Sequence, residues 1–256
     1  MSILFSKELL MAESKVTLTV STDPASATCT LTYNGQSYSA KSATVKKGTV
    51  ISYSVYHSTY GTKTGSIIMD SDYTLTFTGT YTTSTVDVDW TQPVLSSNGT
   101  LGGSDFAVDA TTVDATYYGA WRAFDGITSS TDYFWRSRSL DLGATHPYTI
   151  YNPTPLKITN IAYLNYGQTI VIPISYTVQV SNDNSNWTQI ASGTNSVYTA
   201  GQTWNISLSG NSNYYKYYKL MLQNGSSSGY VICMEMGITA KYQQTSYTYY
   251  WEVTTS

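Results

Sequence analysis

Apolar side chains that alternate with threonine and serine are the feature that most constrains the fold of this 256-residue chain. Segment 16–20 reads VTLTV, segment 28–33 reads TCTLTY, and the same alternation returns in 51–55. A period of two places alternate side chains on opposite faces of an extended strand. The dipeptide Asn34-Gly35 beside these segments is a strong hairpin signal. The pattern therefore predicts short β-strands joined by tight turns.

The composition supports an all-β fold class with few helices. Charged residues make up 11% of the sequence, against about 25% in average soluble domains. Tyrosine occurs 25 times, and both tyrosine and threonine favour strands. Because charges are few, hydroxyl and amide groups must solvate the surface. Such a surface is typical of extracellular adhesins, fibres and virion proteins.

The charge pattern and the hydropathy argue against two classes of partner. The net charge is -3 and the 13 lysines and arginines are scattered, so we expect no nucleic-acid binding. No run approaches the roughly 20 apolar residues that span a bilayer, so we expect no membrane insertion. The N-terminal residues lack a basic region and a long apolar core, and we expect no secretory signal there.

The length allows two domains that each bury a core. Turn and polar residues concentrate between residue 78 and residue 103, where few apolar anchors remain, and this predicts a link between domains. The predicted boundaries are an N-terminal arm over 1–15, a small β-sandwich over 16–82, a linker over 83–95, a second domain over 96–243 and a C-terminal tail over 244–256.

Two interpretations of the arm over 1–15 stay open. Its apolar residues could form one face of a short helix that docks into a neighbouring subunit, which would make the protein a homo-oligomer. An isolated helix of this length is marginal in water, so the arm could equally be a disordered terminus. Met11 could also be the true translation start.

The two cysteines, Cys29 and Cys233, fall in different predicted domains. Each lies within an apolar strand-like segment, and free cysteine is among the most buried residue types. We expect two buried thiols, and neither a disulfide nor a metal site.

The first domain resembles a family of small sandwich modules. The pattern VTLTVSTDPASATCTLTYNGQSY through KKGTVISYSVYHSTYGTKTGSI is similar to the PEGA-like and bacterial Ig-like repeats found in bacterial surface proteins and phage tail proteins. The resemblance covers about residues 16–80. It implies a spacer that presents the next domain and carries no chemistry.

The second domain is organised around residues 120–135, which read AWRAFDGITSSTDYFW. Buried anchors flank a polar turn, in which Asp125 can bond its own backbone and Gly126 can adopt positive φ. Together with YTVQVSNDNSNW at 176–187 and EMGI at 235–238, this stretch resembles the discoidin-like family, the coagulation factor 5/8 type C or galactose-binding-like modules. The resemblance implies a discoidin-like jelly-roll β-sandwich that follows the small Ig-like one.

The chain departs from the family's pattern in two places. KYYK at 216–219 stands where the family often carries Arg-Tyr, which puts a guanidinium contact there in doubt. The family's tryptophan-containing strand has no clear match in this chain. LDLG at 140–143 could be the end of that strand, but we favour the Pro-bounded segment 148–158 as the strand.

The resemblance also implies a structural calcium ion beside the turn. Its ligands would be Asp125 and Glu235, with carbonyl or hydroxyl oxygens from residues 128–132. A hard cation with six to eight oxygen ligands would neutralise two carboxylates in a charge-poor domain. The alternative is that Asp125 only caps its own turn and Glu235 is exposed to solvent.

Sugar recognition in such modules uses exposed rings and fixed polar side chains. Each ring could instead belong to the core, as we expect for Trp135 and Trp187. Arg136 and Arg138 are better candidates, because they would lie on one side of an extended segment in a chain with few charges. The complete set of candidate ligand-binding residues is Tyr117, Tyr118, Trp121, Arg136, Arg138 and Tyr230.

We expect no enzyme, because a glycosidase needs two carboxylates that face one cleft and the two histidines, His57 and His146, are isolated. The predicted function is a phage virion protein, a tail, head-fibre or decoration component, located in the virion. Its second domain would bind a host-surface glycan, and its arm would contact other virion subunits. The alternatives are a purely structural virion protein without glycan binding, or a carbohydrate-binding module of a secreted bacterial protein.

Overall fold

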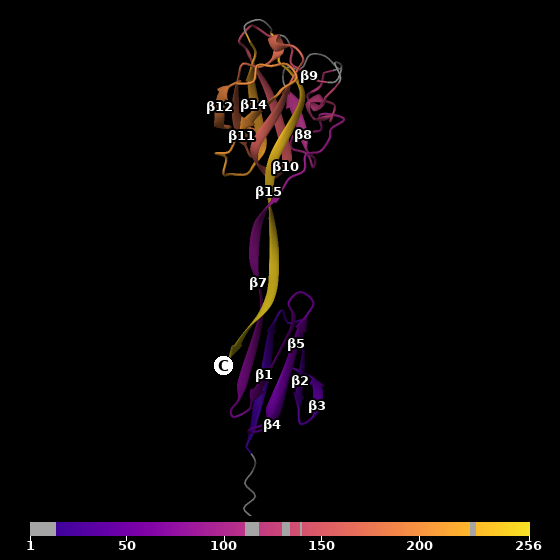
Figure 1. The fold of residues 1–256 in the computed structure, drawn as a ribbon. Coiled ribbons are helices and arrows are strands. Elements are labelled where there is room, and N and C mark those ends of the chain that lie inside the picture. Colours follow the sequence, from indigo (N-terminus) through magenta and orange to yellow (C-terminus); the bar gives the residue numbers. More distant parts are fainter. Residues whose placement is uncertain (1–13, 111–117, 130–133, 139, 226–228) are drawn as a thin grey trace, which may run out of the picture. The chain divides into compact units, whose positions relative to one another are not determined.

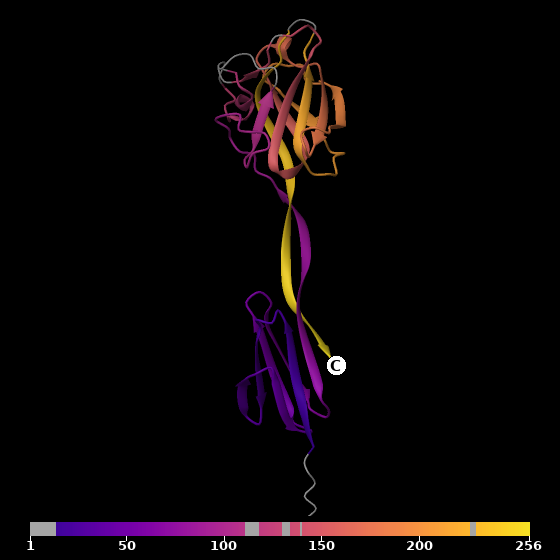
Figure 2. The same ribbon diagram turned by 180° about the vertical axis from the view of Figure 1, so that it is seen from behind.

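A computed structural model describes residues 14–110, 118–129, 134–138, 140–225 and 229–256 (Figures 1 and 2). The chain divides into two compact units, one made of Met1–Thr85 with Thr245–Ser256 and the other of Val86–Gln244. The described residues of both units form strands and turns, with two short 3₁₀ helices in the second. The predicted all-β fold class, built from sandwich-like sheets, is confirmed. No helix among the described residues is long and apolar enough to cross a membrane.

The first unit is a sandwich of two sheets. One sheet has the order β4-β1-β7, in which β1 and β7 are parallel, and the other has the order β3-β2-β5-β6. Asn34 and Gly35 both have positive φ and form the two-residue hairpin that joins β2 to β3. The strands are β1 (Lys15–Asp23), β2 (Thr28–Tyr33), β3 (Gln36–Ser39), β4 (Ser42–Lys46), β5 (Val50–His57), β6 (Gly61–Ile68) and β7 (Tyr73–Asp89).

The alternation seen in the sequence becomes the core of this first unit. Leu18, Leu31, Ile51 and Phe77 are fully buried between the two sheets, while the hydroxyl residues between the apolar positions face outward. Cys29 lies in the same cluster as a free, buried thiol, as predicted.

The second unit contains the remaining elements, except that the end of β15, from Thr245 on, belongs to the first unit. They are β8 (Ala107–Ala110), η1 (Ala120–Phe124), β9 (Trp135–Arg136), β10 (Thr145–Asn165), η2 (Thr169–Val171), β11 (Ser175–Ser181), β12 (Thr188–Thr194), β13 (Thr203–Ser207), β14 (Tyr215–Gln223) and β15 (Ile232–Thr255). β10 includes segment 148–158, which we favoured as a strand, while LDLG at 140–143 leads into the turn before it.

β10 changes partners midway and so connects the two layers of this unit. Residues 145–151 pair with β14 on one side and with β8 on the other. Residues 156–165 pair with β15 and β13. The register shifts between Tyr151 and Leu156, where the strand leaves one layer and enters the other.

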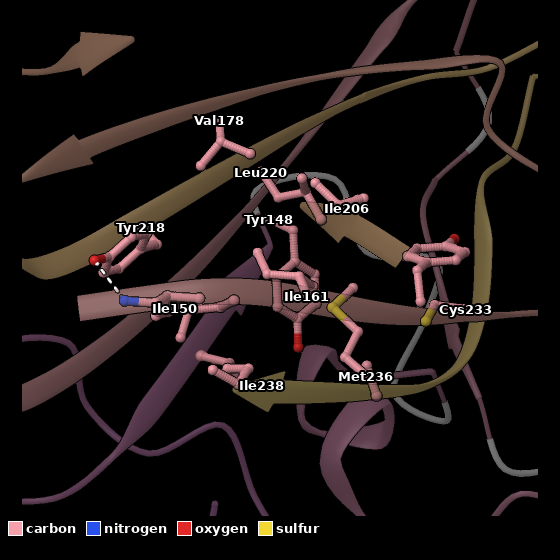
Figure 3. Close-up of a cluster of buried hydrophobic side chains, with 14 of the residues drawn as sticks. Tyr148, Ile150, Ile161, Val178, Ile206, Tyr218, Leu220, Cys233, Met236 and Ile238 are labelled. Atoms are coloured by element: carbon pink, nitrogen blue, oxygen red, sulfur yellow. Dashed lines mark hydrogen bonds between the residues drawn. The ribbon is translucent and has the colours of Figure 1, made fainter. Parts of the chain in front are cut away.

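The core between the layers combines aliphatic side chains with buried tyrosines (Figure 3). The Tyr218 hydroxyl accepts a hydrogen bond from the Ile158 amide at 3.1 Å and donates one to the Leu156 carbonyl at 2.7 Å. Burial raises the pKa of Tyr218 to about 12, because the charged phenolate is disfavoured away from water. The phenol is therefore a neutral hydrogen-bonding group that holds β14 against β10.

The predicted linker over 83–95 and tail over 244–256 are corrected by the structure. β7 continues to Asp89, and β15 continues to Thr255. Residues 245–256 belong to the first unit, where Trp251 is 6% exposed and its Nε1 donates to the Gly61 carbonyl at 3.1 Å. The polar composition of these segments indicates a link or a tail, but threonine and tyrosine are also strand formers.

Trp251 is expected to stabilise the first unit. Its ring contacts Tyr60 and Phe77 at centroid distances of 5.1 Å and 6.3 Å. Truncating a buried tryptophan leaves a cavity, so Trp251→Ala should lower the free energy of unfolding by about 3 kcal/mol. Urea unfolding of the full chain would measure this loss. Tyr250→Ala is the control, because that side chain is 38% exposed; equal losses in the two variants would contradict the assignment.

Candidate functional site

The turn after η1 has the geometry expected from its sequence. Ala123 and Phe124 are fully buried and anchor the turn to the core. The Ile127 amide donates to Asp125 Oδ1 at 2.9 Å, and Gly126 has a φ of +76°. The Asp125 side chain is only 4% exposed, and its Oδ2 lies 3.4 Å from Arg122 Nη1. The fixed carboxylate predicted for this turn is therefore present and is paired with an arginine.

Glu235, on β15, lies against the same turn. The Gly126 backbone lies near the Glu235 carboxylate and favours its charged form. Its Oε2 is buried without a hydrogen-bond partner in the described part of the chain. Burial, and then the negative charge of Asp125, raise the pKa of Glu235 to about 8. The structure thus brings Asp125 and Glu235 together, and the alternative of a fully exposed Glu235 does not hold.

The donor set of this turn fits a hard cation. Calcium takes oxygen ligands, including carboxylates and backbone carbonyls, and Glu235 Oε2 is a buried oxygen that lacks a partner among the described residues. Those residues hold no cluster of three or more His, Cys, Asp or Glu side chains, so further ligands would be carbonyls or hydroxyls. Of the predicted 128–132 segment, residues 130–132 lie outside the described residues, and Arg122 competes for Asp125.

Glu235 should make the second unit less stable as the pH rises in metal-free buffer. Between the ordinary pKa of 4.5 and the folded pKa of about 8, the folded unit keeps a proton that the unfolded chain has lost. The contribution of protonated Glu235 to the free energy of unfolding is therefore fully present below about pH 4.5, and it is lost as the pH rises towards about 8. With a chelator present, the melting temperature of the wild type should fall over this window more steeply than that of Glu235→Gln. Parallel pH profiles would contradict the assignment.

Aromatic rings surround an arginine on the neighbouring strand β9. The Arg136 guanidinium carbon lies 4.3 Å from the ring centroid of Tyr118 and 5.2 Å from that of Tyr230. Tyr118 stacks on Phe134 at 4.9 Å, and Phe134 contacts Tyr166 at 4.7 Å. We call Tyr118, Phe134, Arg136, Tyr166 and Tyr230 the aromatic-arginine cluster.

Four members of the cluster, Phe134, Arg136, Tyr166 and Tyr230, line a pocket of about 320 Å³, which is within the size range of small-molecule sites. Gln168 adds an amide, and Ile170 adds an apolar side chain that is 48% exposed. Arg136 is the charged residue of the lining, and its side chain is held in place by cation-π contacts with two rings. The complete lining is Phe134, Arg136, Tyr166, Gln168, Ile170, Val171, Tyr230 and Ile232.

The structure brings together some of the predicted ligand-binding residues and not others. Tyr118, Arg136 and Tyr230 meet in the cluster. Trp121 does not line the pocket: it packs against the core, and the Arg122 guanidinium lies 4.0 Å from its ring. Arg138 is exposed, and no contact with another described residue places it at the pocket. Tyr117 lies outside the described residues.

Six residues of the pocket were not among the candidates: Phe134, Tyr166, Gln168, Ile170, Val171 and Ile232. Phe134 could have been found from its place before the Trp135-Arg136 pair. Tyr166 and Gln168 follow β10, and nothing in their local sequence indicates which end of the domain they reach.

The two tryptophans expected in the core have different environments. Trp135 is fully buried. Trp187 is half-buried, and Lys219 Nζ lies 3.7 Å from its ring centroid. Lys219 belongs to the KYYK segment, so a cation-π contact occurs there with an ammonium group.

The turn at 182–186 is structural. Asp183 Oδ1 accepts hydrogen bonds from the amides of Asn186 at 2.8 Å and Ser185 at 2.9 Å. These bonds, together with the Asn186 side-chain amide, hold the pKa of Asp183 well below its ordinary value. The carboxylate is therefore used to close the turn between β11 and β12.

Comparisons with known proteins found similarity to solved structures. No protein-family model matches the chain, and no curated protein matches it in sequence. A family 32 carbohydrate-binding module from Clostridium perfringens, in complex with GalNAc-beta-1,3-galactose, is 19% identical with a TM-score of 0.43, over 53% of this chain and 94% of that chain.

Two further solved structures are similar over a comparable share of the chain. The family 32 module of Clostridium perfringens NanJ, in complex with galactose, is 15% identical with a TM-score of 0.42, over 54% of this chain and 93% of that chain. An F5/8 type C domain from Bacteroides fragilis is 14% identical with a TM-score of 0.43, over 54% and 92%.

Proposed function

We propose that the second unit binds a glycan in the pocket beside the aromatic-arginine cluster. The observation that carries the proposal is the Arg136 guanidinium, which lines the pocket and contacts the rings of Tyr118 and Tyr230. A pyranose has an apolar face that packs on an aromatic ring. A guanidinium offers several N–H donors in a fixed plane for sugar hydroxyls. A rigid ring and a fixed donor in one pocket suit such a ligand.

We further propose a setting for this binding. The protein would be a phage virion component, of the tail, head fibre or decoration, in which the first unit presents the discoidin-like unit to the host surface. The N-terminal arm over 1–15 would contact other virion subunits in a homo-oligomer. The charge-poor composition and the resemblance of the first unit to modules of phage tail proteins support this setting.

Two alternatives make different predictions for the same residues. In a purely structural virion protein, neighbouring subunits would cover Tyr118 and Tyr230, and no glycan would bind. In a carbohydrate-binding module of a secreted bacterial protein, glycan binding would be retained, and the gene would not lie among capsid and tail genes.

Arg136→Ala should abolish or strongly weaken glycan binding by the full chain. Loss of a hydrogen-bond donor that is charged costs about 1.5–3 kcal/mol, which corresponds to a fall in affinity of roughly tenfold to 150-fold. Arg138→Ala is the matched control, because it removes the same charge from an exposed position. An immobilised glycan panel that includes galactose and N-acetylgalactosamine, followed by titration calorimetry, would measure the effect. Equal affinities of wild type and Arg136→Ala, or no binding to any glycan, would overturn the proposal.

We also propose that Asp125 and Glu235 hold a structural Ca²⁺. Bound calcium would compensate the charges of both carboxylates and connect β15 to the turn after η1. The buried Glu235 Oε2 without a partner in the described residues supports this assignment.

Calcium should raise the melting temperature of the wild-type chain relative to a chelator. A ligand at 100 times its Kd stabilises a folded protein by about 2.7 kcal/mol. Asp125→Asn keeps the oxygen that closes the turn and removes the charge, so this variant should lose most of the response to calcium. The same calcium response in wild type and variant, or none in the wild type, would contradict the proposal.

A further inference from the structure

The second unit has another pocket, of about 440 Å³, formed by residues from four separate segments. Trp90 follows β7, Asp105 precedes β8, Asn152 lies within β10, and Tyr242 lies on β15. We propose that this pocket is a second sugar-binding site, which takes a neutral hexose unit. It shares no lining residue with the pocket beside the aromatic-arginine cluster.

The pocket lies at the irregularity of β10. Tyr151 is still paired with Ala107 of β8, while Leu156 is already paired with Tyr242 of β15. The residues between them leave the ladder, and the register with β14 shifts at this point. Irregularities of this kind re-aim side chains and are frequent beside binding sites. Here Asn152, directly after the last paired residue, lines the same pocket as Trp90 and Asp105.

Two aromatic side chains, Trp90 and Tyr242, form rigid walls of this pocket. Trp90 and Tyr242 are half-buried, and both pack against the main core of the unit. The centroid of the Trp90 ring lies 5.3 Å from that of the buried Phe106 ring. The Trp90 backbone amide donates a hydrogen bond to the Ala240 carbonyl at 2.9 Å. One part of each ring is thus fixed by the protein, while the remainder contributes to the pocket. An indole and a phenol held in this way offer flat surfaces for the apolar face of a sugar.

The polar groups of the pocket match hydroxyls. The Asp105 carboxylate is exposed and accepts a hydrogen bond from Ser104 Oγ at 3.1 Å. Asn152 is 8% exposed, and its Nδ2 donates to the Thr154 carbonyl at 2.6 Å, which fixes the amide. A carboxylate can accept hydrogen bonds from two hydroxyls at once.

The charge of the pocket favours a neutral ligand. Asp105 is the charged residue of its lining, so an anionic ligand would be repelled. A quaternary ammonium ion would require rings arranged around a small cage. Here Trp90 and Phe106 contact each other, and the volume of about 440 Å³ is large for such a group. A neutral sugar satisfies both the rings and the hydroxyl-binding groups.

The two pockets are far apart along β15. Cys233 pairs with Trp135 beside the aromatic-arginine cluster, and Tyr242 lies nine positions further on. At a rise of about 3.3 Å per residue, this separates the two regions by about 30 Å. β9 and the entry of β7 lie at opposite ends of the unit (Figure 1). One chain therefore offers two separate sites for sugar units.

The test uses the full chain with the Arg136→Ala substitution, which removes the other proposed site. Neutral methyl glycosides of galactose, glucose and N-acetylgalactosamine are titrated while the indole N–H signal of Trp90 is followed by NMR. We expect this signal to shift with at least one glycoside, and Asp105→Asn to weaken that binding about tenfold. Asp141→Asn, at another exposed position, is the matched control and should leave the affinity unchanged.

Two results would overturn the inference: no shift of the Trp90 signal with any glycoside, or equal affinities after Asp105→Asn and Asp141→Asn. The two proposals fail separately. If Arg136→Ala leaves total glycan binding unchanged while Asp105→Asn removes it, the pocket at Trp90 is the site and the proposal for the cluster fails.

Discussion

The double pairing of β10 is the constraint on which the second unit depends. Each half of this strand is hydrogen-bonded on both sides, the first half by β8 and β14 and the second half by β13 and β15. The backbone groups of a buried strand must find partners, so the change of neighbours fixes where the layers meet. Both pockets follow from it. The pocket at Trp90 lies where β10 leaves its first layer, and Tyr166 of the other pocket comes directly after the strand ends.

Because this chain has few charged residues, other polar groups must fix how the elements of its core pack together. In the second unit, buried tyrosine hydroxyls do so by donating to backbone carbonyls, from Tyr148 to Ala120 at 2.6 Å and from Tyr163 to Ile232 at 2.8 Å. These bonds tie the strands to η1 and to the start of β15, the two elements beside the aromatic-arginine cluster. Burial raises the pKa values of both phenols, Tyr148 and Tyr163, well above the ordinary value for tyrosine. Both hydroxyls therefore remain hydrogen-bond donors over the whole physiological pH range.

The sequence predicts the strands and local turns better than the long-range assembly. Alternation identifies the core positions of the first unit, and the Asp125-Gly126 turn forms as its residues require. The same local signals misplace the last twelve residues, because a polar strand and a polar tail have similar compositions. The pocket beside the aromatic-arginine cluster likewise could be predicted only in part from local sequence. Arg136 stands out as a rare charge, whereas Tyr166 joins it through the path of β10, which a local pattern does not contain.

The most direct test of glycan binding follows the Arg136 side chain itself. NMR of the full chain, with the arginine Nε labelled, would record the Arg136 signal during titration with a glycan that the panel identifies. Binding beside the cluster predicts a saturable shift of this signal and of the Tyr118 and Tyr230 ring signals, with Arg138 unchanged. A saturable glycan interaction that leaves all three signals in place would contradict the assignment of the site.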